Sequence, residues 1–150
     1  MADQVRFELV TPEQLLVSQP VDMVVVPGTE GNFGVLPGHA PLISTIRPGT
    51  IDVYEGRTVT SRIFVAGGIA EVTPERCTVL ADEAMPPESL DRAALETEAQ
   101  TIESNLPSLR DQVSHATGPD RERLLTELRH LERQQAVARA KLQVLSEISR

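Results

Sequence analysis

The feature that most constrains the fold is a change in the spacing of apolar residues at Pro86-Pro87. Before this point apolar and polar residues alternate over short runs, as around Val5, Phe7 and Leu9. After it, apolar residues recur every three or four positions. Alternation is typical of half-buried strands, and the longer spacing is typical of one face of a helix. The 150 residues therefore form two halves that follow different structural rules.

The first half, residues 1–86, predicts an antiparallel β-sandwich. Most of the nine glycines and 11 prolines fall here, and short strands separated by Gly and Pro are typical of sandwiches and barrels. The pair Gly67-Gly68 predicts a bulge or a sharp bend inside a strand pair. Further strand residues are expected at 23–26, Ile51, Val53, Val59, Ser61, Ile63, Val65, Val72 and 78–80.

The second half, residues 87–150, predicts an antiparallel hairpin of two helices joined by a turn at 115–120. The proline pair marks the boundary because proline cannot continue a strand ladder. Ser89 is the expected N-cap, with Asp91 in the first turn. We expect Pro107 to kink or break the first helix. The apolar seams are Leu95, Ala99, Ile102, Leu106, Leu109 and Val113, then Leu124, Leu128, Leu131, Gln135, Ala138, Leu142 and Leu145.

The two seams contain few large apolar side chains, so the hairpin needs a second surface to lean on. A hairpin with two docking surfaces of similar strength can adopt two conformations. The second helix is also basic, although the whole chain has a formal net charge of −8. Either the two helices attract each other and carry solvated ion pairs, or an acidic partner surface meets the basic side chains. The arginines concerned are Arg121, Arg123, Arg129, Arg133 and Arg139.

Composition excludes several classes of protein. The acidic balance and an aromatic content of 3% argue against nucleic-acid binding. Cys77 is the only cysteine, so no internal disulfide forms, and its strand-like surroundings predict a packing residue rather than a reactive thiol. Residues 1–4 show no targeting signal, and no apolar run of about 18 residues is present. Membrane association is therefore expected only through a partner.

The residues also give little sign of catalysis. His39, His115 and His130 lack metal-ligand spacing. The glycines at 28, 31 and 34 are not followed by Lys-Ser/Thr, so they predict turns at positive φ rather than a phosphate loop. We expect no catalytic residue, no metal and no bound cofactor.

The segment from Pro27 to Leu42 carries the most specific signal. It reads PGTEGNFGVLPGHAPL and combines Gly and Pro with apolar residues, which predicts a shaped, packed loop that serves as a docking surface. This motif resembles the epsilon subunit of bacterial rotary ATP synthases, which is called delta in mitochondria. Other landmarks of that family follow in the same order: 11–13, 47–49, 66–72 and 78–84.

The resemblance implies a β-sandwich of about ten strands that binds the gamma subunit of the central stalk and the ring of c subunits. Gly31, Asn32 and Phe33 match the part facing the ring, and His39 with Pro41 matches the part facing the stalk. The hairpin, when extended toward the alpha/beta catalytic head, would brake ATP hydrolysis, and Arg123, Arg129 and Arg133 suit that role. The implied protein is non-catalytic, couples proton-driven rotation to ATP synthesis, and lies peripherally on the cytoplasmic face of the bacterial inner membrane.

The chain departs from the family at one motif. Some members bind ATP on the folded hairpin through Ile/Leu-Asp-x-x-Arg-Ala. Leu90 and Asp91 match this pattern, but Ala94 stands in place of the arginine, and Arg92 points about 200° around the helix from it. We therefore expect ATP binding to be weak or absent. The alternative function is a stand-alone module that senses a nucleotide through the hairpin.

Overall fold

The computed structural model describes residues 3–148; Met1 and Ala2, part of the segment expected to carry no targeting signal, lie outside the described residues. The chain divides into two compact units, Met1–Ser89 and Leu90–Arg150, called the β unit and the hairpin below. The elements of the β unit are β1 (Val5–Val10), β2 (Leu15–Val21), β3 (Met23–Gly28), β4 (Gly31–Val35), β5 (Leu42–Ile46), β6 (Gly49–Glu55), β7 (Thr58–Val65), β8 (Gly68–Val72), β9 (Arg76–Ala81), β10 (Ala84–Met85) and the one-turn 3-10 helix η1 (Pro87–Ser89).

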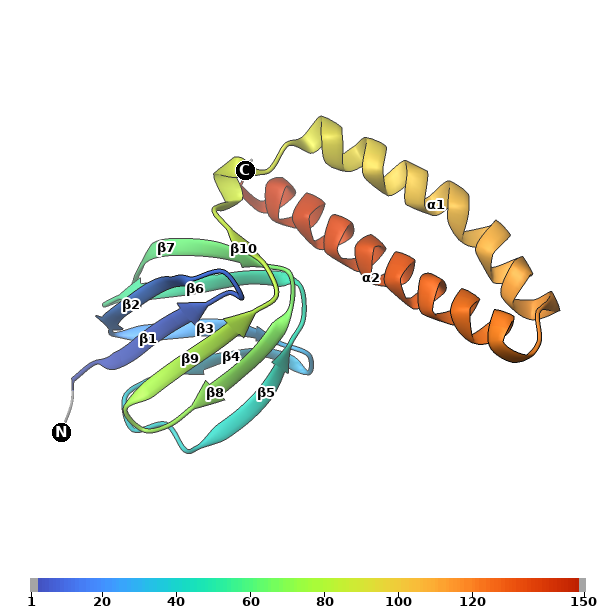
Figure 1. The fold of residues 1–150 in the computed structure, drawn as a ribbon. Helices are drawn as coiled ribbons and strands as arrows, with labels where there is room; N and C mark the ends of the chain where they lie inside the picture. The colour runs from blue at the N-terminus through green and yellow to red at the C-terminus, as the bar shows by residue number, and fades with distance from the viewer. Residues whose placement is uncertain (1–2, 149–150) are drawn as a thin grey trace. The chain divides into compact units, whose positions relative to one another are not determined.

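The predicted sandwich is confirmed. The ten strands form one sheet in the order β10-β7-β6-β3-β5-β8-β9-β1-β2, with β4 paired to β3 alone. The sheet curls into two layers around a single core (Figure 1). Every strand pair is antiparallel except β1 with β9, which run parallel. The alternation seen in the sequence did not reveal that parallel pair.

The core follows from the alternating residues. Val5, Phe7 and Leu9 are fully buried, and the residues between them face outward or lie half-buried. Successive strand side chains point to opposite faces, so each strand contributes every second residue to the core. The other members of the core cluster are Val21, Val24, Val26, Val35, Ile46, Ile51, Val53, Val65, Ala70, Val72, Cys77, Val79 and Ala81.

A sharp bend is present at Gly67-Gly68, but it lies in the connection from β7 to β8 rather than inside a strand pair, and it is not a bulge. Both glycines have positive φ, +116° and +144°. A Cβ added to Gly68 would lie only 2.1 Å from the carbonyl oxygen of Leu80. Glycine is needed here because β8 and β9 approach each other more closely than a side chain allows.

The hairpin consists of α1 (Arg92–His115) and α2 (Gly118–Ile148), which pack against each other (Figure 1). Both predicted seams are confirmed, because each of their residues is buried or half-buried. The largest buried side chains belong to α1, where Leu95, Ile102, Leu106 and Val113 are buried. In α2 the buried residues are Ala138 and Val144, and the sequence did not single out Val144.

Two predictions about the helix ends were wrong. Asp91, not Ser89, is the N-cap of α1, and its Oδ1 accepts a hydrogen bond from the backbone N–H of Ala94 at 3.3 Å. Ser89 instead ends η1. The connection between the helices is also shorter than 115–120, since only Ala116 and Thr117 separate them. The polar residues around both ends allowed more than one cap, and sequence alone did not choose between them.

The predicted break at Pro107 is absent, because α1 continues through it as one helix. A proline inside a helix removes one backbone hydrogen bond and crowds the preceding turn. Ile102 and Leu106 lie before the proline and Val113 lies after it, and all three are buried. We attribute the continuity to this packing on both sides, since burial of one face supplies most of the stability of a helix in a protein.

Candidate docking surface

The segment predicted as a packed loop is largely a hairpin of strands. β3 pairs with β4 through Gly28 and Gly31, so Thr29 and Glu30 form its tip. We call residues 28–33 the docking tip. It borders an open hollow of about 580 Å³ whose other wall is Leu42 to Thr45 of β5. The expectation of a shaped segment holds, but the strand β4 inside it was missed because its glycines suggested turns.

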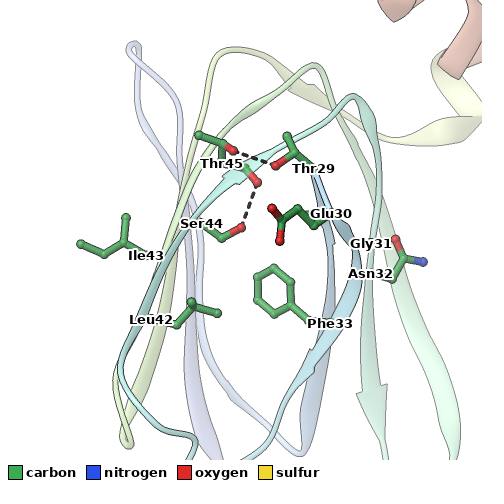
Figure 2. A pocket seen from close by; sticks show the side chains of 10 residues that line it. Thr29, Glu30, Gly31, Asn32, Phe33, Leu42, Ile43, Ser44 and Thr45 are labelled. Atoms are coloured by element: carbon green, nitrogen blue, oxygen red, sulfur yellow. Dashed lines mark hydrogen bonds between the residues drawn. The ribbon is translucent and has the colours of Figure 1, made fainter.

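Figure 2 shows how the side chains around the hollow lie. Phe33 and Leu42 face each other across it, and the Glu30 carboxylate points between Phe33 and Ser44. Asn32 and Ile43 point away from the hollow on opposite sides. The structure thus brings together the three predicted ring-facing residues, of which Gly31 and Asn32 are exposed and Phe33 is half-buried.

The docking tip is held by hydrogen bonds from β5 and the residue after it. The backbone N–H of Thr29 donates to the carbonyl of Thr45 at 3.1 Å, and the two hydroxyls lie 2.9 Å apart. The Arg47 guanidinium donates to the carbonyl of Gly28 and to Oδ1 of Asn32, each at 2.5 Å. These contacts join positions 15 to 19 residues apart, so no local sequence pattern pointed to Arg47.

His39 and Pro41, the predicted stalk-facing residues, belong to a separate turn between β4 and β5. Nδ1 of His39 lies 2.7 Å from the carbonyl oxygen of Ala40, and its backbone N–H donates to Leu36. The N–H of Gly38 donates to the carbonyl of Pro74 at 2.8 Å, which ties this turn to the β8–β9 connection. Neither His39 nor Pro41 lines the hollow beside the docking tip.

The outer face of β5, β8, β9 and β1 carries apolar side chains that the sequence analysis missed. Ile43 is 74% exposed, Ile69 45% and Leu80 49%. Register places Ile69 directly opposite Leu80, which in turn lies opposite Val10 of β1 and thereby next to Leu15 of β2. We call Ile43, Ile69, Leu80 and Leu15 the apolar strip. The available signal was the presence of apolar residues at outward-facing strand positions, which the sequence analysis did not assign to a surface.

Charged residues border this strip. Glu71 of β8 lies opposite Ile43 of β5 in the strand register, and Glu8 forms an ion pair with Arg76 at 3.2 Å. An exposed apolar band with a polar rim is the usual composition of a protein interface.

The predicted basic residues of α2 are exposed. Arg123 has only long contacts along its own helix, 3.9 Å to Asp120 and 3.8 Å to Glu127. Within residues 3–148, Arg129 and Arg133 form no ion pair. An ion pair between the helices runs from Arg110 of α1 to Glu132 of α2 at 3.6 Å, and its basic member lies on α1.

Arg123 shows the solvated pairs along its own helix that the first reading expects. The reading with an acidic partner surface stays a prediction for Arg129 and Arg133.

The residues that resemble a nucleotide motif are used by the hairpin itself. The Asp91 carboxylate caps α1 through the backbone N–H of Ala94, and Leu90 precedes it outside the regular elements. Ala94 offers no cation. Weak or absent ATP binding stays a prediction.

The described residues contain no cluster of three or more metal-ligating side chains. Cys77 is fully buried, and burial raises the pKa of its thiol to about 12, so it is a packing residue as predicted. No helix in residues 3–148 is both long and apolar enough to cross a bilayer.

The family model and the relatives that match this chain agree with each other. The family described as ATP synthase, Delta/Epsilon chain, beta-sandwich domain matches residues 4–87. An ATP synthase epsilon chain of Rhodospirillum centenum is 53% identical over 148 residues, which cover 97% of this chain and 94% of that relative. The epsilon chain of Rhodospirillum rubrum is 58% identical over 106 residues, 71% of this chain and 79% of the relative. A chain in the Euglena gracilis mitochondrial ATP synthase structure (OSCP/F1/c-ring, rotational state 1) shares the fold, with a TM-score of 0.68 at 21% identity, covering 97% of this chain and 83% of that one.

Proposed function

The chain belongs to the family of ATP synthase delta and epsilon chains, and from this premise we propose that it is a non-catalytic rotor subunit of the central stalk. In this proposal the β unit docks on the gamma subunit and on the ring of c subunits, so that proton-driven rotation reaches the catalytic head. The hairpin brakes ATP hydrolysis when it extends toward that head. The subunit is held on the cytoplasmic face of the bacterial inner membrane through these partners.

The observation that carries the docking proposal is the apolar strip. Ile43, at 74% exposed, and its neighbours Ile69 and Leu80 form a band on one face of the sheet. Residues of this size at the centre of an interface supply much of its binding free energy once water is excluded. We assign this face, with the turn that carries His39 and Pro41, to the gamma subunit. The bond from Gly38 to Pro74 supports the joint assignment, because it holds that turn against the β8–β9 connection.

The docking tip is assigned to the c-ring. Its Gly31 and Asn32 are exposed, and it is held in shape by donation from the Thr29 N–H to the Thr45 carbonyl and by hydrogen bonds that Arg47 donates. A pre-organised loop loses less conformational entropy on binding than a mobile one, which favours tight docking. β5 carries Ile43 of the apolar strip and contacts the docking tip through the hydrogen bond between Thr29 and Thr45, so one strand links the two proposed contacts.

The unpaired arginines of α2 support the proposed brake. Arg129 and Arg133 are exposed and form no ion pair within residues 3–148, so their charge is available to an acidic surface of the catalytic head. Such a contact depends on ionic strength, since exposed charges are screened by salt.

The docking assignment is tested by binding to a purified assembly of gamma and the c-ring. Replacing Ile43 with Asp places a carboxylate in the proposed interface and should weaken binding at least about tenfold. The matched control is Leu16→Asp, because Leu16 is an exposed apolar residue that lines a different hollow with Ile63 and Met85. Equal binding of Ile43→Asp and the unaltered chain would refute the assignment of this face.

The brake is tested by adding the chain to a catalytic head that contains gamma but lacks epsilon, and by following ATP hydrolysis. The unaltered chain should slow hydrolysis, whereas a truncation after Ser89 should bind without slowing it. Arg129→Glu/Arg133→Glu should also release the inhibition, and Arg92→Glu at the start of α1 is the control for added charge. If the unaltered chain binds and hydrolysis is unchanged, the hairpin is not a brake.

A further inference from the structure

We propose that Arg47 is the positioning residue of the docking tip: its guanidinium fixes the tip and orients Asn32 for the partner. This inference rests on the proposed function, because it concerns the same contact with the rotor ring. Arg47 lies outside the tip in sequence and follows the end of β5.

The guanidinium joins both strands of the tip. One nitrogen, Nη1, donates to the carbonyl of Gly28 at the end of β3, and Nη2 donates to Oδ1 of Asn32 on β4. Gly28 and Asn32 stand on opposite sides of the Thr29-Glu30 turn. A single planar side chain therefore fixes the backbone of one strand and a side chain of the other.

The rest of the tip supplies little rigidity of its own. Thr29, Glu30, Gly31 and Asn32 are exposed, and glycine restricts the backbone less than any other residue. Gly28 is sterically required, because a Cβ there would lie 2.8 Å from the carbonyl oxygen of Gly31. Since exposed glycine-rich turns are mobile unless side chains hold them, the contacts from outside the turn decide its conformation.

The base of the Arg47 side chain is itself fixed. Its backbone N–H donates to the carbonyl of Pro27 at 3.0 Å, and Pro48 follows it directly. A Cβ added to Gly49 would lie 3.1 Å from Cβ of Pro27, so this segment runs close against β3. Arg47 thus reaches the tip from a rigid position.

The geometry requires arginine rather than lysine. A guanidinium presents several N–H donors in a fixed plane, whereas an ammonium group on a flexible stem is a point charge. Lysine at this position would satisfy Gly28 or Asn32 but not hold both in one geometry. Within residues 3–148 no carboxylate forms an ion pair with Arg47, so the tip carbonyl and amide are its polar partners.

The test is a double-mutant cycle in the full chain, read as binding to the gamma and c-ring assembly. Arg47→Lys should weaken binding about tenfold, the equivalent of one charge-assisted hydrogen bond. Asn32→Ala should weaken it by a similar or smaller factor. The double variant should bind no more weakly than Arg47→Lys, because both changes act through one contact. Arg62→Lys, which alters a 3.6 Å ion pair with Asp52 away from the tip, is the matched control.

A second measurement separates positioning from stability. In the free chain, Arg47→Lys should speed amide exchange and shift the resonances of residues 31–33 while leaving the melting temperature and the core resonances unchanged. The proposal would be overturned if Arg47→Lys left the tip resonances unaltered or bound the assembly as tightly as the parent chain. It would also be overturned if the binding losses of the two single variants simply added in the double-mutant cycle. If the parent chain fails to bind the assembly, the proposed function fails instead, and the tip resonances still decide whether Arg47 positions the tip.

Discussion

Gly68 gives the sharpest prediction about the fold. In Gly68→Ala the new Cβ would lie 2.1 Å from the carbonyl oxygen of Leu80 and 2.9 Å from Cα of Ala81. Both are backbone atoms, so no side-chain rotation relieves the contact, and β9 must move by about 1 Å. Such overpacking costs about 1–3 kcal/mol. The φ of +144° adds strain of about 1–3 kcal/mol for a residue with a Cβ.

The combined loss of about 2–6 kcal/mol is a large part of the 5–15 kcal/mol that stabilises a typical domain. It should lower the melting temperature of the β unit by about 10 °C or more. Tyr54 is the only tyrosine, no tryptophan is present, and β6 contains it, so tyrosine fluorescence during urea or thermal unfolding reports on this unit alone.

Gly31→Ala separates the cost of the steric clash from the cost of the backbone strain. Gly31 has a φ of +133°, but a Cβ there would meet no atom within 4 Å. It should therefore show the strain without the clash, and the destabilisation should be smaller than that of Gly68→Ala by about 1–3 kcal/mol. Equal destabilisation by the two substitutions would refute the reasoning from close approach, because only backbone strain would then operate.

Three further predictions concern the hairpin and the core. Asp91→Ala removes the N-cap of α1 and should reduce the stability of the hairpin by about 1 kcal/mol, visible as faster amide exchange in the first turn, whereas Asp91→Asn should preserve it. Pro107→Ala should stabilise α1, because it restores one backbone hydrogen bond; unchanged exchange in this helix would mean that the packing already offsets the proline. Burial raises the pKa of Cys77 above its unfolded value, so the stability that the neutral thiol contributes is present below about pH 9 and is lost as the pH rises toward 12. Unfolding measured from pH 8 to 11 should show this decline in the parent chain and a weaker one in Cys77→Ala.

Much of the fold was predictable because it depends on periodicity. The alternation of Val5, Phe7 and Leu9 marks a strand with one buried face, and these side chains are fully buried. The helical seams were predictable for the same reason. Register and hydrogen bonding between distant residues fix the parts that were missed: the parallel pairing of β1 with β9, and the strand β4 within a glycine-rich segment.

The docking tip was predictable from its motif, but the means by which it is held was not. Arg47 and Asn32 are 15 residues apart, and only the pairing of β3 with β4 and the course of β5 bring them together. The apolar strip shows a similar limit. Ile69 and Leu80 are ordinary strand residues in the sequence, and only the curvature of the sheet determines which face is exposed. The break expected at Pro107 does not occur, because packing on both sides of the proline outweighs local propensity.

The parallel pairing of β1 with β9 also determines when the β unit can finish folding during translation. β1 and β2 form a two-stranded ribbon that joins the rest of the sheet only through β9, about 70 residues later. An isolated ribbon of this size is marginally stable in water. β1 and β2 must therefore wait for a stable place in the sheet until residues 76–81 have emerged from the exit tunnel. Closure of this long loop makes the contact order high and the assembly of the β unit slow. The helical hairpin, whose contacts are local, can form as soon as it is synthesised.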